Sequence, residues 1–398
     1  MRILFIADGR SPIALNWIAH FVDQGQEVHL VSTFPCEPAM RLASLHCVPV
    51  AFSQMKATRG EGKGIRGRGA GEKGRGVLLE ALGVRMRTVL RQAFGVMTIP
   101  QAARRLRPII AAIQPDFVHA MRIPYEGMLA AQALREFPEL PLLVSVWGND
   151  FTLHAAANPW MGSATRRTLA RANALHVDCQ RDLRLAYRWG YPQGKPAIVL
   201  PGNGGVQTEL FYPSEGERSA ETVINPRGFR AYVRNDTFFK AVPLVLALRP
   251  SVKFICPAMA DEPRARRWID ELGIAAAVEL LPALPRPQMA DLFRQAAVAV
   301  SPSTHDGTPN TLLEAMACGC FPIAGDLESL REWINPGVNG LLVDPGDPRA
   351  LAEAILIALE NPELRRGAVS HNFNLIAERA EHAKVMAEVK RFCLSIWE

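Results

Sequence analysis

Short apolar runs alternate with helical stretches along the chain, and this alternation limits the fold more than any other feature. In the first half, the runs that predict strands are residues 3–7, 27–32, 117–120, 142–147, 174–178 and 197–200. Strands that alternate with helices pair in parallel, because each helix carries the chain back to the starting edge of the sheet. A parallel sheet needs helices on both faces, so we expect an α/β fold.

The same alternation begins again after residue 201. Strands are predicted at residues 222–225, 252–256, 278–281, 297–301, 321–324 and 340–343, with helices between them. The glycine-rich segment 201–205 separates the two series, and its composition indicates a hinge. We therefore predict two doubly wound, Rossmann-like domains, residues 1–201 and 202–375, that face each other across a cleft. In such sheets, ligands bind at the carboxyl ends of the strands.

Composition agrees with a globular chain of two domains and excludes several other classes. Of the 398 residues, 48% are apolar and 21% are charged. No apolar stretch approaches the ~18 residues that a membrane-spanning helix needs. Seven cysteines without a Cys-x-x-Cys pair and nine histidines without a His-x-x-x-His pair argue against a zinc site and favour a reducing compartment. We expect a cytoplasmic protein with no metal cofactor.

One segment of the second half carries two carboxylates around the start of a predicted helix. Asp306 precedes Thr308, which suits the N-cap, and Pro309, which suits the first helical position, while Glu314 follows within the helix. Free N–H groups at such a helix start, residues 309–311 here, attract phosphate. Carboxylates beside them accept hydrogen bonds from sugar hydroxyls. The segment can therefore hold a sugar joined to a diphosphate.

This segment closely resembles the acidic motif of the family-4 retaining glycosyltransferases, also called glycosyl transferases group 1. The motif is written E-x7-E followed by A-M-A-x-G-x-P; here it reads Asp306-x7-Glu314, then Ala-Met-Ala-Cys-Gly at 315–319 and Pro322. The first acid is aspartate rather than glutamate, which shortens the side chain by one methylene. The resemblance implies a GT-B fold, in which the final helix, here within residues 376–398, crosses back to the first domain.

The resemblance also implies which residues contact a nucleotide-sugar donor. Asp306 stands at the sugar, and the donor-binding positions are Gly307, Thr308, Pro309, Asn310, Thr311, Glu314 and, in the loop under the base, Leu284. Gly9 and Ser11 lie in the loop after the first strand, which in this fold approaches the donor phosphates. A plain turn between strand and helix explains Gly9 and Ser11 equally well.

Three arginines, Arg227, Arg230 and Arg234, follow the first strand of the second half at the ligand end of the predicted sheet. A departing nucleoside diphosphate carries negative charge, which arginine can stabilise without a metal. We interpret Arg227 and Arg234 as catalytic and Arg230 as a donor-binding residue. The family has an arginine at the position of Arg227 and a lysine near that of Arg234. A solvated basic loop is the alternative.

His119 ends a predicted strand of the first domain and is a candidate for a polar group near the reacting carbon. In many family members the histidine placed for catalysis comes two positions later, where this chain has Met121. Trp147 replaces a second family histidine. We keep His119 as a catalytic candidate, with a core histidine bonded to the backbone as the alternative.

A basic, glycine-rich stretch interrupts the first domain. Residues 59–76 hold six basic and two acidic residues and eight glycines, and the helix predicted after them carries Arg85, Arg87 and Arg91. This composition cannot bury a core, so we predict a disordered loop. An anionic membrane could attract this region at the inner face of the membrane, and a solvated basic face is the alternative. Nucleic acid is not expected, because no aromatic residues interleave the charges.

The resemblance implies a metal-independent, retaining glycosyltransferase without a cofactor. It would move a sugar from a nucleoside-diphosphate sugar to an acceptor hydroxyl of a lipid-linked or cell-surface glycan. The alternatives are another GT-B enzyme, either a nucleotide-sugar epimerase or a phosphorylase, and a non-catalytic nucleotide-sugar-binding partner. The sequence names neither the base nor the sugar nor the acceptor.

Overall fold

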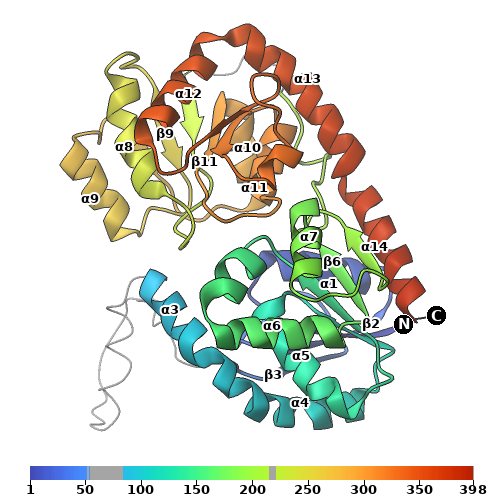
Figure 1. Cartoon of the computed structure of the whole chain (residues 1–398). Coiled ribbons are helices and arrows are strands. Elements are labelled where there is room, and N and C mark those ends of the chain that lie inside the picture. The colour runs from blue at the N-terminus through green and yellow to red at the C-terminus, as the bar shows by residue number, and fades with distance from the viewer. Residues whose placement is uncertain (52, 54–83, 215–220, 398) are drawn as a thin grey trace, which may run out of the picture.

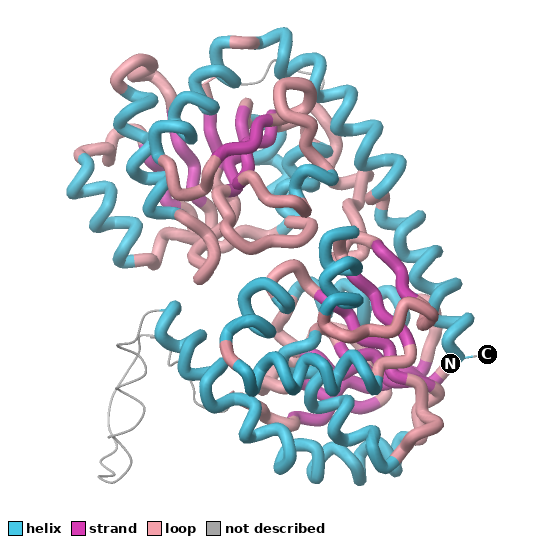
Figure 2. The backbone as a smooth tube through the Cα atoms, viewed as in Figure 1, coloured by secondary structure: helices cyan, strands magenta, loops and turns pink. Residues whose placement is uncertain are grey.

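The computed structural model describes residues 1–51, 53, 84–214 and 221–397, and the basic stretch at 59–76 lies outside this range. The described chain forms two domains, each with one parallel sheet between helices (Figures 1 and 2). The first sheet has the order β3-β2-β1-β4-β5-β6-β7 and the second the order β10-β9-β8-β11-β12-β13. The predicted α/β fold of two doubly wound domains is confirmed.

The strands of the first sheet are β1 (Arg2–Ala7), β2 (Glu27–Ser32), β3 (Ser44–Cys47), β4 (Phe117–Ala120), β5 (Leu142–Val146), β6 (Ala174–Val177) and β7 (Ala197–Val199). Those of the second are β8 (Thr222–Ile224), β9 (Lys253–Cys256), β10 (Val278–Leu280), β11 (Val298–Ser301), β12 (Phe321–Gly325) and β13 (Leu341–Val343). Strand β3 was not predicted, because this edge strand is only partly buried and lacks the apolar run of a central strand.

The longer helices of the first domain are α1 (Pro12–Asp23), α3 (Val84–Phe94), α4 (Ile99–Ile113), α5 (Met128–Ala133), α6 (Pro159–Arg171) and α7 (Gln180–Arg188). The second half has α8 (Asn235–Leu246), α9 (Pro263–Leu272), α10 (Arg286–Gln295), α11 (Asn310–Ala317), α12 (Pro348–Glu360), α13 (Pro362–Arg379) and α14 (His382–Trp397). Short helices are η1 (Gly95–Thr98), η2 (Ile123–Gly127), η3 (Leu134–Glu136), η4 (Asp150–His154), η5 (Ala155–Ala157) and η6 (Leu330–Glu332).

Local sequence signals determine where several of these helices begin. Ser11, Asn158 and Asp347 cap α1, α6 and α12 with their side chains, and a proline follows each cap. Proline suits this place because its missing N–H would have no helical partner. Helix α11 departs from the predicted start, because Pro309 rather than Thr308 is its N-cap residue and no side chain caps it.

Helix α14 carries the chain from the second domain back to the first. It runs from the second domain to the first sheet, where the chain termini lie close together in Figure 1. Its buried residues Val385, Met386, Val389 and Cys393 belong to the same apolar cluster as the first strand and α1. The final helix therefore covers one face of the first domain. Among the described residues, no helix is long and apolar enough to cross a membrane.

Candidate active site

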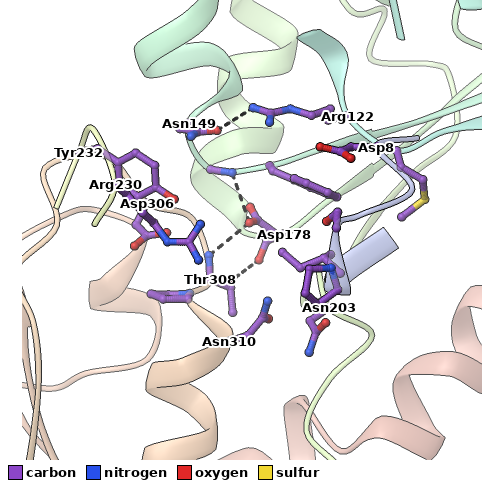
Figure 3. A pocket seen from close by; sticks show the side chains of 18 of the residues that line it. Asp8, Arg122, Asn149, Asp178, Asn203, Arg230, Tyr232, Asp306, Thr308 and Asn310 are labelled. Atoms are coloured by element: carbon purple, nitrogen blue, oxygen red, sulfur yellow. Dashed lines mark hydrogen bonds between the residues drawn. The ribbon is translucent and has the colours of Figure 1, made fainter. Parts of the chain in front are cut away.

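A cavity of about 710 Å³ lies between the domains, and residues that follow the strands of both sheets line it (Figure 3). Asp8, Trp147 and Asp178 come from the first domain, just after β1, β5 and β6. Arg227 and Asp306 come from the second, after β8 and β11. The carboxyl ends of the two sheets thus face one common space, as the fold class predicts.

Arg227 joins three segments of the second domain at the cavity wall. Its side chain is 7% exposed and donates from Nη2 to Asp306 Oδ2 at 2.5 Å and from Nη1 to Thr311 Oγ1 at 3.1 Å. Its backbone N–H donates to Asn225 Oδ1 at 3.2 Å, which fixes the loop after β8. A guanidinium held this way at a helix start offers positive charge where an anion can approach.

Glu314 lies one turn into α11 and pairs with Arg286 at the start of α10. Arg286 Nη2 donates to Glu314 Oε1 at 3.1 Å, and its Nη1 donates to Gln207 Oε1 at 3.0 Å. Burial raises the pKa of Glu314 to about 7, although the nearby Arg286 opposes the shift. Near neutral pH, the Glu314 carboxyl group is therefore present in both its protonated and its ionised form.

Most of the predicted donor residues line this cavity. Those that do are Ser11, Arg227, Arg230, Asp306, Thr308, Pro309, Asn310, Thr311 and Glu314. Those that are not among the lining residues are Gly9, His119, Arg234, Leu284 and Gly307. The structure therefore gathers the acidic segment and two of the three arginines around one space.

Two proposed catalytic residues lie away from the cavity. His119 is fully buried, its Nε2 is 2.8 Å from Ser145 Oγ, and its ring packs against Trp17. Burial holds the pKa of His119 well below its usual range. Arg234 instead forms a bidentate pair with Asp236, at 2.9 and 2.8 Å. His119 thus lies in the core, as the alternative interpretation proposed, although its hydrogen bond is to a side chain rather than to the backbone. Arg234 is not among the residues that line the cavity, and its guanidinium is paired with Asp236.

The two glycines that were predicted to bind the donor, Gly9 and Gly307, lie at close backbone contacts and are not among the residues that line the cavity. Gly9 donates its N–H to Ser32 Oγ at 3.0 Å, and a Cβ atom there would lie 2.3 Å from Cys36 Sγ. A Cβ atom on Gly307 would lie 2.3 Å from both carboxylate oxygens of Asp178 in the other domain. Both positions need glycine because neighbouring groups approach the backbone closely.

The domains touch directly beside the cavity. Asp178 Oδ2 accepts from the N–H groups of Gly148 and Thr308, both at 3.3 Å, and the Thr308 hydroxyl donates to the Asp178 carbonyl (Figure 3). Arg181 Nη1 donates to the Asp306 carbonyl at 2.6 Å and to Ser329 Oγ at 3.0 Å. The loop with the first acid of the motif is therefore held from the opposite domain.

Glu332 strengthens the same contact, because its carboxylate accepts from the N–H groups of Gln180 and Arg181 at the start of α7, at 3.0 and 3.1 Å. A carboxylate at a helix start is favoured by the helix dipole. The alignment of α7 with the second domain thus has an electrostatic cause.

One group in the described chain has the spacing of metal ligands, which the sequence analysis did not anticipate. Ligand atoms of Asp178, Cys179 and Asp182 lie within 4.8 Å of one another. Arg181 pairs with Asp182 at 2.7 Å, and burial next to Asp182 raises the pKa of Asp178 well above its usual range. Arg181 and the raised pKa of Asp178 reduce the negative charge that would attract a cation.

The opposite wall of the cavity, in the first domain, combines aromatic rings with arginines. Arg122 lies 5.5 Å from the ring centre of Trp147 and donates to Asp150 Oδ1 at 2.9 Å. The Arg91 guanidinium lies 5.1 Å from the ring centre of Tyr125. Trp147 was noted from the sequence only as the replacement of a family histidine. Arg91, Arg122 and Tyr125 were not predicted as cavity residues, because they come from separated loops and helices and form no local motif.

Solved structures first define the class of protein to which this arrangement belongs. A sucrose-phosphate synthase from Thermosynechococcus elongatus superposes with a TM-score of 0.73 at 16% identity, over 99% of this chain and 100% of that chain. Anabaena Alr3699/HepE in complex with UDP and glucose superposes with a TM-score of 0.73 at 14% identity, over 99% and 100%. At such low identity these likenesses establish the fold, which is the GT-B fold.

Family models then identify the chain more narrowly. Residues 9–202 match the glycosyl transferase 4-like domain, and residues 218–372 match the glycosyl transferases group 1. The chain belongs to the group 1 glycosyltransferases, as the acidic motif indicated.

Curated relatives agree with this family. A D-inositol 3-phosphate glycosyltransferase of Thermobispora bispora is 39% identical over 218 residues, covering 48% of this chain and 51% of the relative. Another protein of that name, from Thermomonospora curvata, is 37% identical over 233 residues, covering 51% and 53%. The chain thus spans about half the length of the curated relatives it matches.

Proposed function

We propose that this protein transfers a sugar, with retention of configuration, from a nucleoside-diphosphate sugar to a hydroxyl group of an acceptor. The observation that carries the proposal is the position of Arg227, which links Asp306 to Thr311 at the uncapped start of α11. Positive charge, a helix start and a carboxylate meet there. Together they suit a diphosphate joined to a sugar.

Within this proposal, different residues of the second domain bind the diphosphate, the sugar and the ribose of the donor. Arg227 and Arg230 face the diphosphate and stabilise the charge that grows on it as the sugar departs. Asp306 accepts from the sugar, and Glu314 accepts from the ribose once Arg286 yields its hydrogen bond. A uridine donor is supported by a structural neighbour, since Anabaena Alr3699/HepE was solved with UDP and with UDP-glucose.

No metal or other cofactor is part of the proposed mechanism. Arg227 and Arg230 are both cavity residues and supply cationic groups at the place of the leaving group. Transfer should therefore persist in excess EDTA. Loss of activity in EDTA, with recovery on adding magnesium or manganese, would contradict this part of the proposal.

The proposed acceptor is a hydroxyl-bearing compound in the synthesis of a lipid-linked or cell-surface glycan. The curated relatives bear the name of an enzyme that acts on D-inositol 3-phosphate, which makes a polyol phosphate a second candidate. Both candidates present hydroxyl groups to the same cavity. The curated relatives give more support to the polyol phosphate.

An anionic membrane is the further partner that we propose, at the surface where α3, η1 and α6 meet. Large apolar side chains are exposed there: Val89, Phe94, Met97 and Trp160. Arg166 and Arg167 lie exposed on α6 nearby. Apolar side chains with cationic neighbours suit the interface of an anionic bilayer. Flotation with phosphatidylglycerol vesicles should fall as salt rises, and flotation indifferent to lipid charge would contradict docking.

The decisive experiment is a test of nucleotide binding and sugar release. The full-length protein should be stabilised against heat by UDP more than by other nucleoside diphosphates, and it should slowly hydrolyse UDP-sugars without acceptor. Asp306→Asn should spare UDP binding and depress hydrolysis. Epimerisation without release of UDP would indicate the epimerase alternative. Binding without any turnover would indicate the non-catalytic alternative.

A further inference from the structure

The charged groups on the first-domain wall of the cavity do not balance one another. Asp8 is paired with Arg10 at 2.9 Å. Glu126 is buried, and its two carboxylate oxygens accept from the Thr33 hydroxyl at 2.6 Å and from the Tyr125 N–H at 2.9 Å. The acidic groups on this wall therefore already have donors.

Arg91 has no such counterpart. Its guanidinium lies 5.4 Å from the ring centre of Phe34 and 5.1 Å from that of Tyr125, and it has no ion pair with any residue in the described part of the chain. Its Nε is buried and has no hydrogen-bond acceptor within the described ranges. A cation in this state lacks the anion that would compensate its desolvation.

Unpaired donors continue along this wall. The Tyr125 hydroxyl, Trp147 Nε1 and Arg122 Nε are buried and have no hydrogen-bond partner among the residues that the structure describes, and all three residues line the cavity. Tyr125 is only 5% exposed, so its hydroxyl is an enclosed polar group with nothing to bond. Unsatisfied buried groups are rare in folded proteins and indicate a ligand or a functional role.

His154 adds no positive charge to the wall that could replace an arginine. Burial, followed by the charges of Arg122 and Arg91, lowers the pKa of His154 to about 3. Its Nδ1 lies 3.2 Å from Gln92 Nε2, so its ring is also occupied. The arginines alone give this wall its positive charge at neutral pH.

We propose that the first-domain wall binds an acceptor that carries an anionic group, a phosphate or a carboxylate, together with its reacting hydroxyl. Arg91 turns from the Phe34 and Tyr125 rings to bind the anion, while the Tyr125 hydroxyl and Trp147 Nε1, which have no hydrogen-bond partner among the described residues, donate to the acceptor. Arg122 is held by Asp150 at 2.9 Å and keeps the wall positive. This inference rests on the proposed transferase function, because the second domain must supply the sugar.

The first-domain wall should bind this anionic acceptor more tightly than an uncharged one. An uncharged polyol would leave the Arg91 charge without an anion, whereas a phosphate can accept two hydrogen bonds from one guanidinium. A free polyol phosphate and a phosphate in a lipid headgroup share this chemistry. The test therefore offers both.

The experiment measures transfer from UDP-glucose, or the UDP-sugar that the protein hydrolyses, to matched acceptors. Inositol 3-phosphate is compared with myo-inositol, and phosphatidylinositol vesicles with phosphatidylcholine vesicles. We expect the phosphorylated acceptor of one pair to have a KM at least about tenfold below that of its uncharged counterpart. Preference for the soluble phosphate or for the vesicle then identifies the source. Equal KM values for charged and uncharged acceptors would overturn the inference.

Variants assign the effect to the wall. Arg91→Met should abolish the preference for the anionic acceptor, and Arg91→Lys should restore part of it. Arg188→Met, which changes an exposed arginine of α7 away from the cavity, is the matched control. An unchanged acceptor KM in Arg91→Met would contradict the assignment even if the protein is an active transferase.

Tyr125→Phe is the second, independent variant. The Tyr125 hydroxyl has no hydrogen bond to any described residue, so a purely structural role predicts unchanged thermal stability and unchanged kinetics. A role in binding predicts a higher KM for the anionic acceptor with unchanged UDP affinity. If UDP does not bind the parent protein and no UDP-sugar is hydrolysed, the transferase proposal fails first. If both occur and the Tyr125→Phe kinetics are unchanged, only the acceptor inference fails.

Discussion

Arg227 shows how single side chains acquire a role from residues far away in sequence. The guanidinium contacts Asp306 and Thr311, which lie 79 and 84 positions further along the chain. Arg234 is close to Arg227 in sequence, yet its partner is Asp236. Both are arginines in one loop, and only the direction of each side chain separates them. The sequence therefore determines that both residues are cationic, and the fold determines which group each arginine contacts.

Loss of the Arg227 guanidinium should reduce turnover more than donor affinity, because the charge on the leaving group grows toward the transition state. We expect Arg227→Ala to lower kcat on the order of 100-fold, by analogy with loss of one oxyanion donor. Arg227→Lys should recover only part, since a point charge does not reproduce the bidentate fork. The measurements are kcat at saturating donor and UDP affinity by calorimetry. Arg234→Ala serves as the control and should stay within a few-fold of the parent, and equal losses in both variants would oppose this division.

Glu314 should make UDP affinity depend on pH. Its pKa in the free protein is about 7, raised chiefly by burial, and only the ionised carboxylate offers both oxygens to ribose hydroxyls. Affinity should therefore rise as pH increases from 5 to 8 and level off above about 8. In Glu314→Gln this dependence should disappear and affinity should be weaker at pH 8. Calorimetric titration across the pH range checks both, and an unchanged slope in Glu314→Gln would assign the titration to another group.

Folding stability should change with pH in the opposite direction at this residue. Because the folded pKa of Glu314 lies above its ordinary value of 4.5, the native state holds this proton more tightly than the unfolded chain. The stability from this group is present at low pH and is lost as pH rises from about 4.5 to about 7. Urea unfolding of the parent and Glu314→Gln at pH 5 and 8 should show a smaller difference between the two pH values in the variant.

At the scale of elements, helices α11 and α14 place the site in different ways. Helix α11 begins at Asn310 without a side-chain cap, so its start is turned toward the cavity instead of being closed by Thr308. The Thr308 hydroxyl donates to the Asp178 carbonyl of the other domain. A residue that looked like a local cap thus became part of a contact between domains. Helix α14 instead acts by packing, since it carries an apolar stripe from the second half of the chain onto the first sheet.

Helix α14 should contribute directly to the stability of the first domain. Met386 is fully buried against this domain, and truncation to alanine leaves a cavity that costs about 2–5 kcal/mol in the free energy of unfolding. Glu388→Ala, on the exposed side of the same helix, is the matched control and should change little. Urea unfolding followed by circular dichroism measures both. If Met386→Ala is as stable as the control, α14 is not held by this packing.

For the whole molecule, the relation between the domains depends on two glycines that meet across the cleft. A Cβ atom on Gly148 would lie 1.7 Å from the Gly307 nitrogen, and one on Gly307 would collide with Asp178. The backbones therefore approach more closely than any side chain permits. Around them, Arg181 and Glu332 add hydrogen bonds across the same contact. Gly148, Asp178, Asp306 and Thr308, which take part in this contact, also line the cavity.

Gly307→Ala should separate the domains without unfolding either one. The added methyl group would meet both Asp178 oxygens at 2.3 Å, and its neighbours on both sides are held by hydrogen bonds. We expect kcat to fall on the order of 100-fold, since small misplacements of reacting groups have effects of this size. UDP affinity, which we assign to the second domain, should change little, and small-angle scattering should report a larger radius of gyration. Gly367→Ala, where no atom lies within 4 Å of the added carbon, is the control.

The sequence by itself determined the two parallel sheets, because buried strands and the helices between them are written in local runs of apolar residues. It also determined the acidic segment, since Asp306, Thr308, Pro309 and Glu314 lie within one short motif. Each predicted strand matches an observed one. Strand β3 was not predicted, because an edge strand needs only partial burial.

Only the tertiary structure decided which side chains share the cavity. His119 and Met121 are two positions apart, yet one is enclosed by Trp17 and Ser145 while the other lines the cavity. Asp178, Arg91 and Tyr125 come from three separate segments and carry no common motif in the sequence. Their arrangement depends on long-range packing of the two sheets, and no local pattern encodes the distances that such packing creates.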